Sequence, residues 1–433
     1  MFFLNYLSPG TQTTVHTSPD TVAVDTRDGQ LTILDFTKKF CPAVFTGFKP
    51  AWWLPNGHAQ TAYVAAGNFE EVDKVKYERK YIRLPDSGTL GIDFTPPFDV
   101  PLDPATPIIV VEHGLTGGSH ESYVRNILSA ACAPKSEGGL GYRGAVINFR
   151  GCAGTPITSP RFYSAACEDD LACGALYISS LFPQAKMVGV GFSLGASVVT
   201  RYLGNEGAMS RLAGGLALAC GNWFNRSVYS SAMGGNLLRL YKSHAHSIEK
   251  FEGSHALTIH EKVLSLKNPK LIDIDHVLVS QTGGASPNWP FPSALEYYHH
   301  ASSDKSLPGI KVPYLAINAE DDPIVRLIPK PDDGSTKASG WAIVAITQGG
   351  GHLGWFEDGE KRGETPKWIR KPALQWLRAV IEEFVRDPGQ GGRPTEVVDG
   401  FTREVGRPEV GFKEIDAKDL PQAGKASGLT QGL

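Results

Sequence analysis

Ser193 lies between two glycines in the segment GVGFSLGASVV, which spans residues 189–199. The run AKMVGVGF before the serine is short, apolar and rich in valine, as in a buried strand, whereas SLGASVVTRYLG has the apolar spacing of a helix. A Gly-x-Ser-x-Gly sequence at a sharp strand-to-helix turn presents the serine Oγ at the end of a sheet. The pattern therefore predicts a nucleophilic serine, with the backbone N–H of Leu194 directed at an oxyanion.

A serine nucleophile needs a base, and the base needs an acid that orients it. In doubly wound folds the acid and then the histidine follow later strands of the chain. The run VPYLAINAEDDPIV supplies Asp321 and Asp322, and WAIVAITQGGGHLGW supplies His352 after the last predicted strand. Asp322 is favoured as the acid because Pro323 would help fix the turn that aims its carboxylate at the site, whereas Asp321 could instead point to solvent. Asp321 remains the alternative acid.

The loop VEHGLTGGSHESYV follows the first long apolar run and has glycines at 114, 117 and 118. These glycines let the backbone approach a substrate, and the N–H of Leu115 is the predicted second oxyanion donor. The alternative is a phosphate-binding loop, but the P-loop and dinucleotide-binding patterns are absent. His299 and Asp304 fit an H-x4-D acyltransferase pattern, which is weak because histidines in such a segment usually serve surface or core packing.

Six short apolar runs must position these residues: TPIIVVEHG, GAVINFRG, AKMVGVGF, GGLALACG, VPYLAINAE and WAIVAIT. Most are separated by segments long enough for a helix, which predicts an α/β fold with a mostly parallel, doubly wound sheet. The gap from Asn222 to Val312 predicts a largely helical cap inserted before the strand that carries the acid. The expected divisions are an N-terminal arm (1–45), the first part of the core (46–222), the cap (223–311), the second part of the core (312–386) and a flexible C-terminal tail rich in Gly, Pro and charge (387–433).

The cap segment is rich in aromatic and aliphatic side chains that could roof an apolar slot for an acyl group. Trp223, Phe224 and Trp289 are the candidate substrate-binding residues. The same side chains could instead pack the interior of the cap.

The 433-residue chain carries 42 basic and 45 acidic residues, a formal net charge of −3. The basic and acidic residues are nearly balanced, so the charge does not indicate nucleic-acid binding. Six cysteines show no C-x-x-C pair and no zinc-type spacing, so no metal is predicted and the thiols are expected to be free in a reducing compartment. The apolar start MFFLNYL is too short for a signal peptide, and no run approaches the about 18 apolar residues of a membrane span. A cytoplasmic protein is expected, with attachment to a membrane or lipid droplet left open.

Six motifs occur in one order along the chain: WWLPNGHAQT (52–61), HGLTGGSHESYVR (113–125), NFRGCAGTP (148–156), GFSLGAS (191–197), NAEDDP (318–323) and GGHLGW (350–355). Together they resemble the AB hydrolase 4 family of the α/β-hydrolase superfamily, over roughly residues 45–386. That family includes YheT-like esterases, abhydrolase-domain lipases and fungal medium-chain fatty acid ethyl ester synthase/esterases. The resemblance implies an α/β-hydrolase fold and a charge relay of Ser193, Asp322 and His352. Two departures, Ser197 in place of asparagine and HAQT in place of HLQT, could reshape the acyl pocket.

The residues and the resemblance together predict a serine hydrolase or acyltransferase that forms an acyl-enzyme on Ser193. The acyl donor would be a fatty acyl ester, of medium chain length by resemblance, or acyl-CoA. The acceptor would be water or an alcohol, and no cofactor is expected. The alternatives are a dedicated O-acyltransferase acting on an alcohol or a secondary metabolite, and a catalytically silent hydrolase-fold binding protein. The oligomeric state is not predicted.

Overall fold

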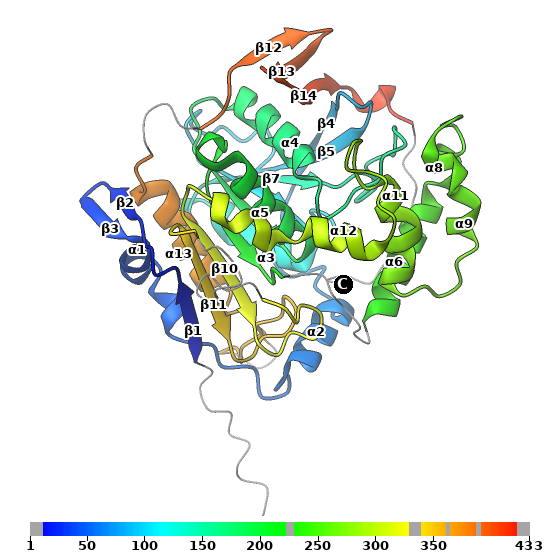
Figure 1. Cartoon of the computed structure of the whole chain (residues 1–433). Helices are drawn as coiled ribbons and strands as arrows, with labels where there is room; N and C mark the ends of the chain where they lie inside the picture. The colour runs from blue at the N-terminus through cyan, green and yellow to red at the C-terminus, as the bar shows by residue number, and fades with distance from the viewer. Residues whose placement is uncertain (1–11, 222–228, 329–338, 361–363, 387–390, 422–433) are drawn as a thin grey trace, which may run out of the picture.

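The computed structural model describes residues 12–221, 229–328, 339–360, 364–386 and 391–421. Within these ranges a twelve-stranded sheet runs through the molecule in the order β1-β11-β10-β9-β8-β6-β7-β5-β4-β14-β13-β12 (Figure 1). The strands are β1 (Thr13–Thr17), β4 (Glu78–Arg83), β5 (Thr89–Thr95), β6 (Ile108–Glu112), β7 (Arg143–Asn148), β8 (Met187–Phe192), β9 (Leu212–Leu218), β10 (Tyr314–Ala319), β11 (Ala342–Thr347), β12 (Thr395–Val398), β13 (Phe401–Glu404) and β14 (Arg407–Ile415).

The centre of the sheet is parallel and consists of β7, β6, β8, β9, β10 and β11. Every residue of these strands is buried, because helices cover both faces, so apolar residues need not alternate with polar ones. In β6, Ile108 and Val110 join the core on one face, and Ile109 and Val111 join the core on the other. The predicted α/β fold with a mostly parallel central sheet is confirmed, and antiparallel strands extend it at both edges.

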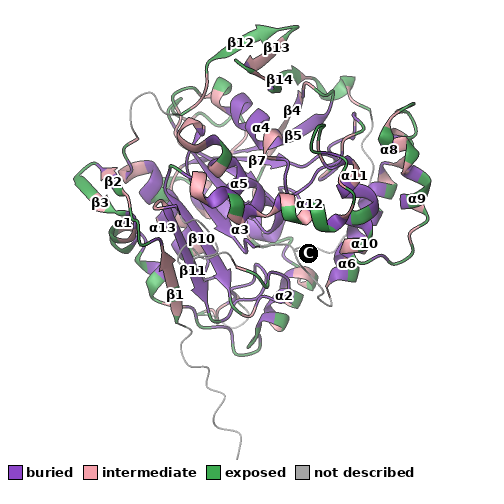
Figure 2. Ribbon diagram, in the orientation of Figure 1, coloured by how far each residue is buried: buried purple, intermediate pink, exposed green. Residues whose placement is uncertain are grey.

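Two groups of helices enclose the sheet, and Figure 2 shows the strands buried between them. One core includes residues of α4 (Glu168–Leu181) and α5 (Leu194–Glu206). The opposite core includes residues of α1 (Ile33–Phe40), α2 (Gly57–Ala66), α3 (Ser122–Cys132) and α13 (Arg370–Arg378). The helices cover the two faces of the sheet, and the loops that follow the carboxyl ends of the parallel strands lie at one edge of it. In such sheets these loops carry functional residues.

The N-terminal segment adds to the edge of the fold. Strand β1 pairs antiparallel with β11, and β2 (Ala23–Thr26) forms a hairpin with β3 (Gly29–Thr32). Helix α1 then packs Phe36 against Trp376 of α13, with ring centroids 6.0 Å apart. Residues 12–40 are therefore held by backbone pairing and by a shared aromatic core.

The segment before β10 is helical and gathers at one side of the molecule (Figure 1). Its elements are α6 (Ser230–Ser243), α7 (Ala245–Ile248), α8 (His255–Thr258), α9 (His260–Leu264), α10 (Leu271–Ile274), a π-helical turn (Asp275–Val279), α11 (Ser280–Thr282), α12 (Ala294–Ala301) and a 3₁₀ segment (Ser303–Gly309). Leu237 and Leu271 of this segment line one cavity with Leu115 and Leu194, which follow β6 and β8. The segment thus reaches the carboxyl ends of the parallel strands.

The C-terminal segment differs from the flexible tail expected for residues 387–433. Residues 395–415 form β12, β13 and β14, and β14 pairs antiparallel with β4. Val410 and Phe412 of β14 are buried, and the Phe412 ring lies 5.1 Å from that of Tyr177. The expectation was wrong for these strands because a few inward-facing apolar residues are enough to anchor a strand whose other positions are polar. Residues 387–390 and 422–433 lie outside the described ranges.

Candidate active site

Ser193 occupies the sharp turn between β8, which ends at Phe192, and α5, which begins at Leu194. Its backbone has φ 54° and ψ −113°, a conformation that non-glycine residues rarely adopt and that concentrates at functional sites. A Cβ at Gly191 would collide with the backbone of Gly195, and a Cβ at Gly195 would collide with the carbonyl of Glu112. Both glycines are therefore needed so that β8 and α5 can pack closely around the serine.

His352 connects the serine to a carboxylate. Its Nε2 lies 2.8 Å from the Oγ of Ser193, and its Nδ1 lies 2.8 Å from Oδ2 of Asp322. Because an ionised carboxylate only accepts hydrogen bonds, Nδ1 carries the proton and Nε2 is free to accept from the serine hydroxyl. The three side chains are 5% exposed or less, so this chain of hydrogen bonds is shielded from bulk water.

The two adjacent aspartates after β10 have different partners. Asp322 Oδ2 binds His352, and its Oδ1 accepts from the N–H groups of Ile324 at 2.7 Å and Val325 at 2.9 Å. Asp321 Oδ1 instead accepts from the N–H of Gly351 at 2.9 Å, and the residue is half-buried, so its carboxyl is not simply directed to solvent. Burial raises the pKa of the Asp321 carboxyl above its ordinary value, although backbone hydrogen bonds oppose this. Asp321 thus holds the loop that carries the histidine.

The loop after β6 is fixed on both sides of Leu115. The N–H of Gly114 donates to the hydroxyl of Tyr123 at 3.0 Å, and the N–H of Thr116 donates to the hydroxyl of Tyr163 at 3.0 Å. Between them, the N–H of Leu115 has no acceptor among the described residues. A Cβ added at Gly114 would lie 3.6 Å from Cβ of Ser193, so this loop passes close to the serine.

The N–H of Leu194 lies at the amino end of α5, where the first N–H groups have no partner within a helix. The next N–H, that of Gly195, donates to the carbonyl of His113 at 3.1 Å, whereas within the described chain Leu194 finds no acceptor. Burial lowers the pKa of His113 to about 3, so its ring is neutral. That ring lies 2.7 Å from the carbonyl of Gly114 and accepts from the N–H of Phe149 at 3.2 Å, which fixes the base of the loop.

Helix α2 holds the histidine loop from the other side, a role that the sequence did not reveal. The hydroxyl of Thr61 accepts from the backbone N–H of His352 at 2.8 Å. Gln60 donates to the carbonyl of Leu54 at 2.9 Å and accepts from the N–H of Phe356 at 2.8 Å. Both residues belong to the motif WWLPNGHAQT, so the motif was visible in the sequence but its contacts were not.

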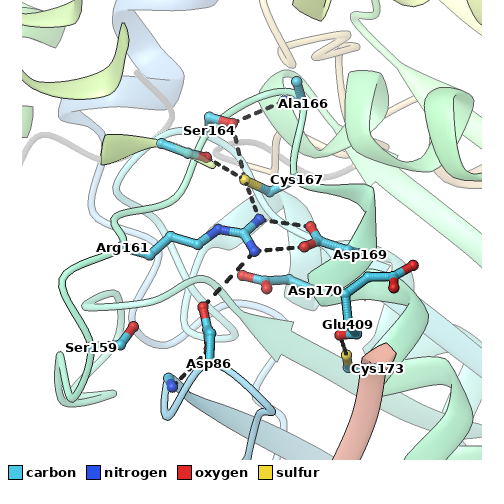
Figure 3. Close-up of polar contacts among 12 residues, drawn as sticks. Asp86, Ser159, Arg161, Ser164, Ala166, Cys167, Asp169, Asp170, Cys173 and Glu409 are labelled. Atoms are coloured by element: carbon cyan, nitrogen blue, oxygen red, sulfur yellow. Dashed lines mark hydrogen bonds and ion pairs between the residues drawn. The ribbon is translucent and has the colours of Figure 1, made fainter. Parts of the chain in front are cut away.

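The loop between β7 and α4 is held by buried and half-buried ion pairs, part of which Figure 3 shows. Arg161 binds Asp169 through two hydrogen bonds of 2.6 and 2.7 Å. Arg150 binds Asp170 through bonds of 2.8 and 2.7 Å and reaches Asp86 at 2.6 Å. This ionic cluster supports the residues after Arg161, of which Tyr163, Ser164 and Ala165 line the cavity beside Leu115 and Leu194.

The candidate substrate-binding residues have different outcomes. Trp223 and Phe224 lie outside the described residues. Trp289 donates its Nε1–H to the carbonyl of Val279 at 2.9 Å and packs edge-on against Phe291. It is not among the residues that line the cavity beside Leu115 and Leu194, so it packs the interior of the helical segment. The H-x4-D pair is also separated, since His299 contacts Lys305 while Asp304 accepts from Ser302.

All six cysteines carry free thiols, five of them buried and Cys132 half-buried. Within the described ranges, no three His, Cys, Asp or Glu side chains gather as ligands for a metal ion. Those ranges also contain no helix with both the length and the apolar character needed to cross a bilayer.

The sequence of residues 108–362, more than half of the chain, matches the family described as "Alpha/beta hydrolase family". The chain therefore belongs to the alpha/beta hydrolase family. It is 31% identical over 381 residues to a Saccharomyces cerevisiae protein named monoacylglycerol lipase, with 76% of this chain and 80% of that one covered. It is 30% identical to an abhydrolase domain-containing protein of Dictyostelium discoideum, covering 78% and 82% of the two chains. It is 28% identical to monoacylglycerol lipase ABHD2 of Mus musculus, covering 80% and 83%.

Proposed function

We propose that this protein is a carboxylic ester hydrolase that works through a Ser-His-Asp triad. His352 takes the proton of Ser193 as the serine attacks the ester carbonyl, and Asp322 orients the imidazole and stabilises its protonated form. The N–H groups of Leu115 and Leu194 bind the oxyanion that forms in the transition state. Loss of one such donor typically costs about 3–4 kcal/mol of transition-state stabilisation.

One observation carries this proposal: the hydrogen-bonded line Ser193–His352–Asp322, with both bonds at 2.8 Å, in a buried site. The free N–H groups of Leu115 and Leu194 support it, because their neighbours Gly114, Thr116 and Gly195 all donate to protein acceptors. The family and the lipases among its relatives agree with ester hydrolysis. A catalytically silent binding protein does not require a serine in a strained backbone conformation that is aligned with a histidine and an aspartate.

We further propose that the substrate carries a fatty acyl chain of medium length, donated by an ester or by acyl-CoA. The yeast and mouse relatives are named monoacylglycerol lipase, which makes a monoacylglycerol one candidate ester. The resemblance of six motifs to the AB hydrolase 4 family supports the medium chain length. In this proposal residues 223–311 act as a cap over the site, and the protein works in the cytoplasm, with contact to lipid surfaces as its route to apolar esters.

A panel of nitrophenyl esters of increasing acyl length tests the substrate class. Each methylene buried in an apolar slot contributes about 0.8 kcal/mol, so kcat/KM should rise about three- to fourfold per added CH₂ until the slot is full. Ser193→Ala should abolish turnover of every ester. Acetyl esters as the best substrates would instead indicate a small pocket and contradict the proposal.

We propose that the acyl-enzyme can also be released by an alcohol, because the buried site restricts access of water. The ester-to-acid ratio should rise with alcohol concentration and be the same for a nitrophenyl ester and for acyl-CoA as donor, since both give one intermediate on Ser193. Ratios that depend on the donor would indicate direct transfer in a ternary complex. Ester formation without any hydrolysis would favour the dedicated O-acyltransferase.

A further inference from the structure

A buried carboxyl group of the helical segment lies beside the two oxyanion loops. Asp275 is 5% exposed, and it begins the π-helical turn Asp275–Val279. It lines the same cavity as Leu115 and Leu194. π-Helical turns are rare and occur frequently at functional sites. The triad mechanism makes no use of this carboxyl.

Only one oxygen of this carboxyl is satisfied by the protein. The hydroxyl of Tyr298, which also lines the cavity, donates to Oδ2 of Asp275 at 2.6 Å. No described residue donates to Oδ1. Oδ1 is not among the described side-chain atoms that are both cut off from solvent and unpaired. It is therefore open to a small group that enters the cavity and can accept a hydrogen bond from it.

We propose that Asp275 binds a hydroxyl group of the ester substrate through Oδ1, with Tyr298 fixing the orientation of the carboxyl. This inference rests on the proposed ester hydrolase activity and names its substrate class: esters that carry a free hydroxyl group near the scissile bond. Asp275 is then a specificity-determining residue rather than part of the triad.

The chemistry of the cavity favours a hydroxyl over a cation. Leu237, Leu271 and Val279 form apolar walls around the carboxyl, and a full ion pair in such surroundings carries a high desolvation cost. Burial raises the pKa of Asp275 to about 7, so the carboxyl is available near neutral pH both as donor and as acceptor, which suits a hydroxyl. The cavity measures about 20 Å³, enough for one water-sized group such as a hydroxyl.

The test compares three esters of one chain length: a propyl ester, the corresponding 1-monoacylglycerol, and a propyl ester whose acyl chain bears a hydroxyl. The readout is the kcat/KM of each hydroxyl ester divided by that of the plain propyl ester. We expect wild type to prefer one hydroxyl ester, and Asp275→Leu to lower that preference about tenfold or more. Which ester responds shows whether the hydroxyl lies on the alcohol or on the acyl side.

Two further variants keep the result interpretable. Asp275→Leu combined with Tyr298→Phe leaves no unpaired hydroxyl behind and should show the same loss if the single variant folds poorly. Glu296→Gln makes a similar charge change at an exposed position of α12 and should leave the ratio unchanged.

Equal ratios in wild type and in folded Asp275 variants would overturn the inference. The choline ester of the same acid, measured as a fourth substrate, tests for a cation site. If Asp275→Leu lowers kcat/KM for the choline ester more than for the hydroxyl esters, the site binds a cation and the inference is overturned. If Ser193→Ala abolishes turnover of all three esters, the proposed hydrolase stands whatever the ratios are. If Ser193→Ala retains turnover, the hydrolase proposal itself fails.

Discussion

The molecule contains two buried polar regions that are built in opposite ways. The ionic cluster of Arg150, Arg161 and their aspartates places opposite charges in contact, with the side chains of Arg150 and Asp170 only 3% and 5% exposed. The triad region is buried throughout and arranges a serine, an imidazole and one carboxylate in a line. The ionic cluster pairs each arginine with an aspartate and fixes a loop. The triad region keeps a strained serine and two free N–H groups.

This difference separates a structural role from a chemical one. Breaking a buried ion pair leaves an uncompensated charge in both the resting and the reacting protein, so it should change stability. Removing a triad member takes away interactions that strengthen only in the transition state, so it should change kcat. Variants in the two regions should therefore move different measurements.

The largest effect is expected at the serine and the histidine. Ser193→Ala or His352→Ala should lower kcat by ~10⁴ or more, because either change disables the whole unit. The midpoint of thermal unfolding should shift less than in an ionic-cluster variant, because Asp322 keeps the N–H groups of Ile324 and Val325 as partners when His352 is removed. Steady-state turnover and calorimetry on the same preparation check both statements. If either variant lost as much stability as an ionic-cluster variant, the proposed separation between a catalytic and a structural region would be contradicted.

The two adjacent aspartates test the contrast within the active site. Asp322→Asn should lower kcat by ~10³–10⁴ through loss of imidazole orientation. Asp321→Asn should cost much less, because Asp321 binds backbone N–H groups of Gly351 and Gly57 and is not the carboxylate that contacts His352. The measurement is kcat of the two variants. If Asp321→Asn lowered kcat more than Asp322→Asn, Asp321 would be the acid of the triad.

The ionic cluster should respond in stability. Arg150→Met leaves Asp170 buried without its main partner and should lower the free energy of unfolding by about 3–5 kcal/mol. Urea denaturation measures this loss. Lys39→Met, which removes the exposed pair with Asp28, serves as control and should change stability by less than about 1 kcal/mol. Folded Arg150→Met protein should keep kcat within a few-fold of wild type, and a loss comparable to Ser193→Ala would contradict the separation.

Asp275 shares features with both regions. It is a buried carboxyl, like those of the ionic cluster, but it has a single protein partner, Tyr298. Its pKa is raised by burial from 3.8 to about 7. The folded protein thus keeps a proton that the unfolded chain loses, and this contribution to stability is present below pH 3.8 and is lost as the pH rises through about 7. Asp275→Asn should gain stability relative to wild type across that window. Denaturation at a series of pH values measures it, and a flat difference would contradict the burial argument.

Much of the geometry of the candidate active site could be predicted from local sequence patterns. The strand, turn and helix around Ser193 are encoded within a few residues, because the Gly-x-Ser-x-Gly spacing is required by close contacts of that turn. His352 was placed after the last strand by the same reasoning. The choice between Asp321 and Asp322 rested on Pro323 and on the family resemblance, whereas in the structure the N–H groups of residues 324 and 325 orient Asp322.

Contacts between distant segments could not be predicted. Thr61 meets the histidine loop across 291 positions of sequence, and no local pattern encodes such a bond. Strand β14 was missed because its composition is mostly polar and does not indicate a strand. The strand is stabilised by backbone pairing with β4, a distant segment of the chain. Trp289 was assigned to the substrate because composition cannot distinguish the interior of a helical segment from a surface that faces a cavity.

Covalent labelling tests the central claim, that Ser193 is the activated nucleophile, most directly. Purified, folded protein is treated with a fluorophosphonate probe, and its intact mass and peptide map are measured. One adduct per chain, located on Ser193 and absent from Ser193→Ala, is the predicted result. No adduct on wild type, or an adduct that persists in Ser193→Ala, would contradict the assignment.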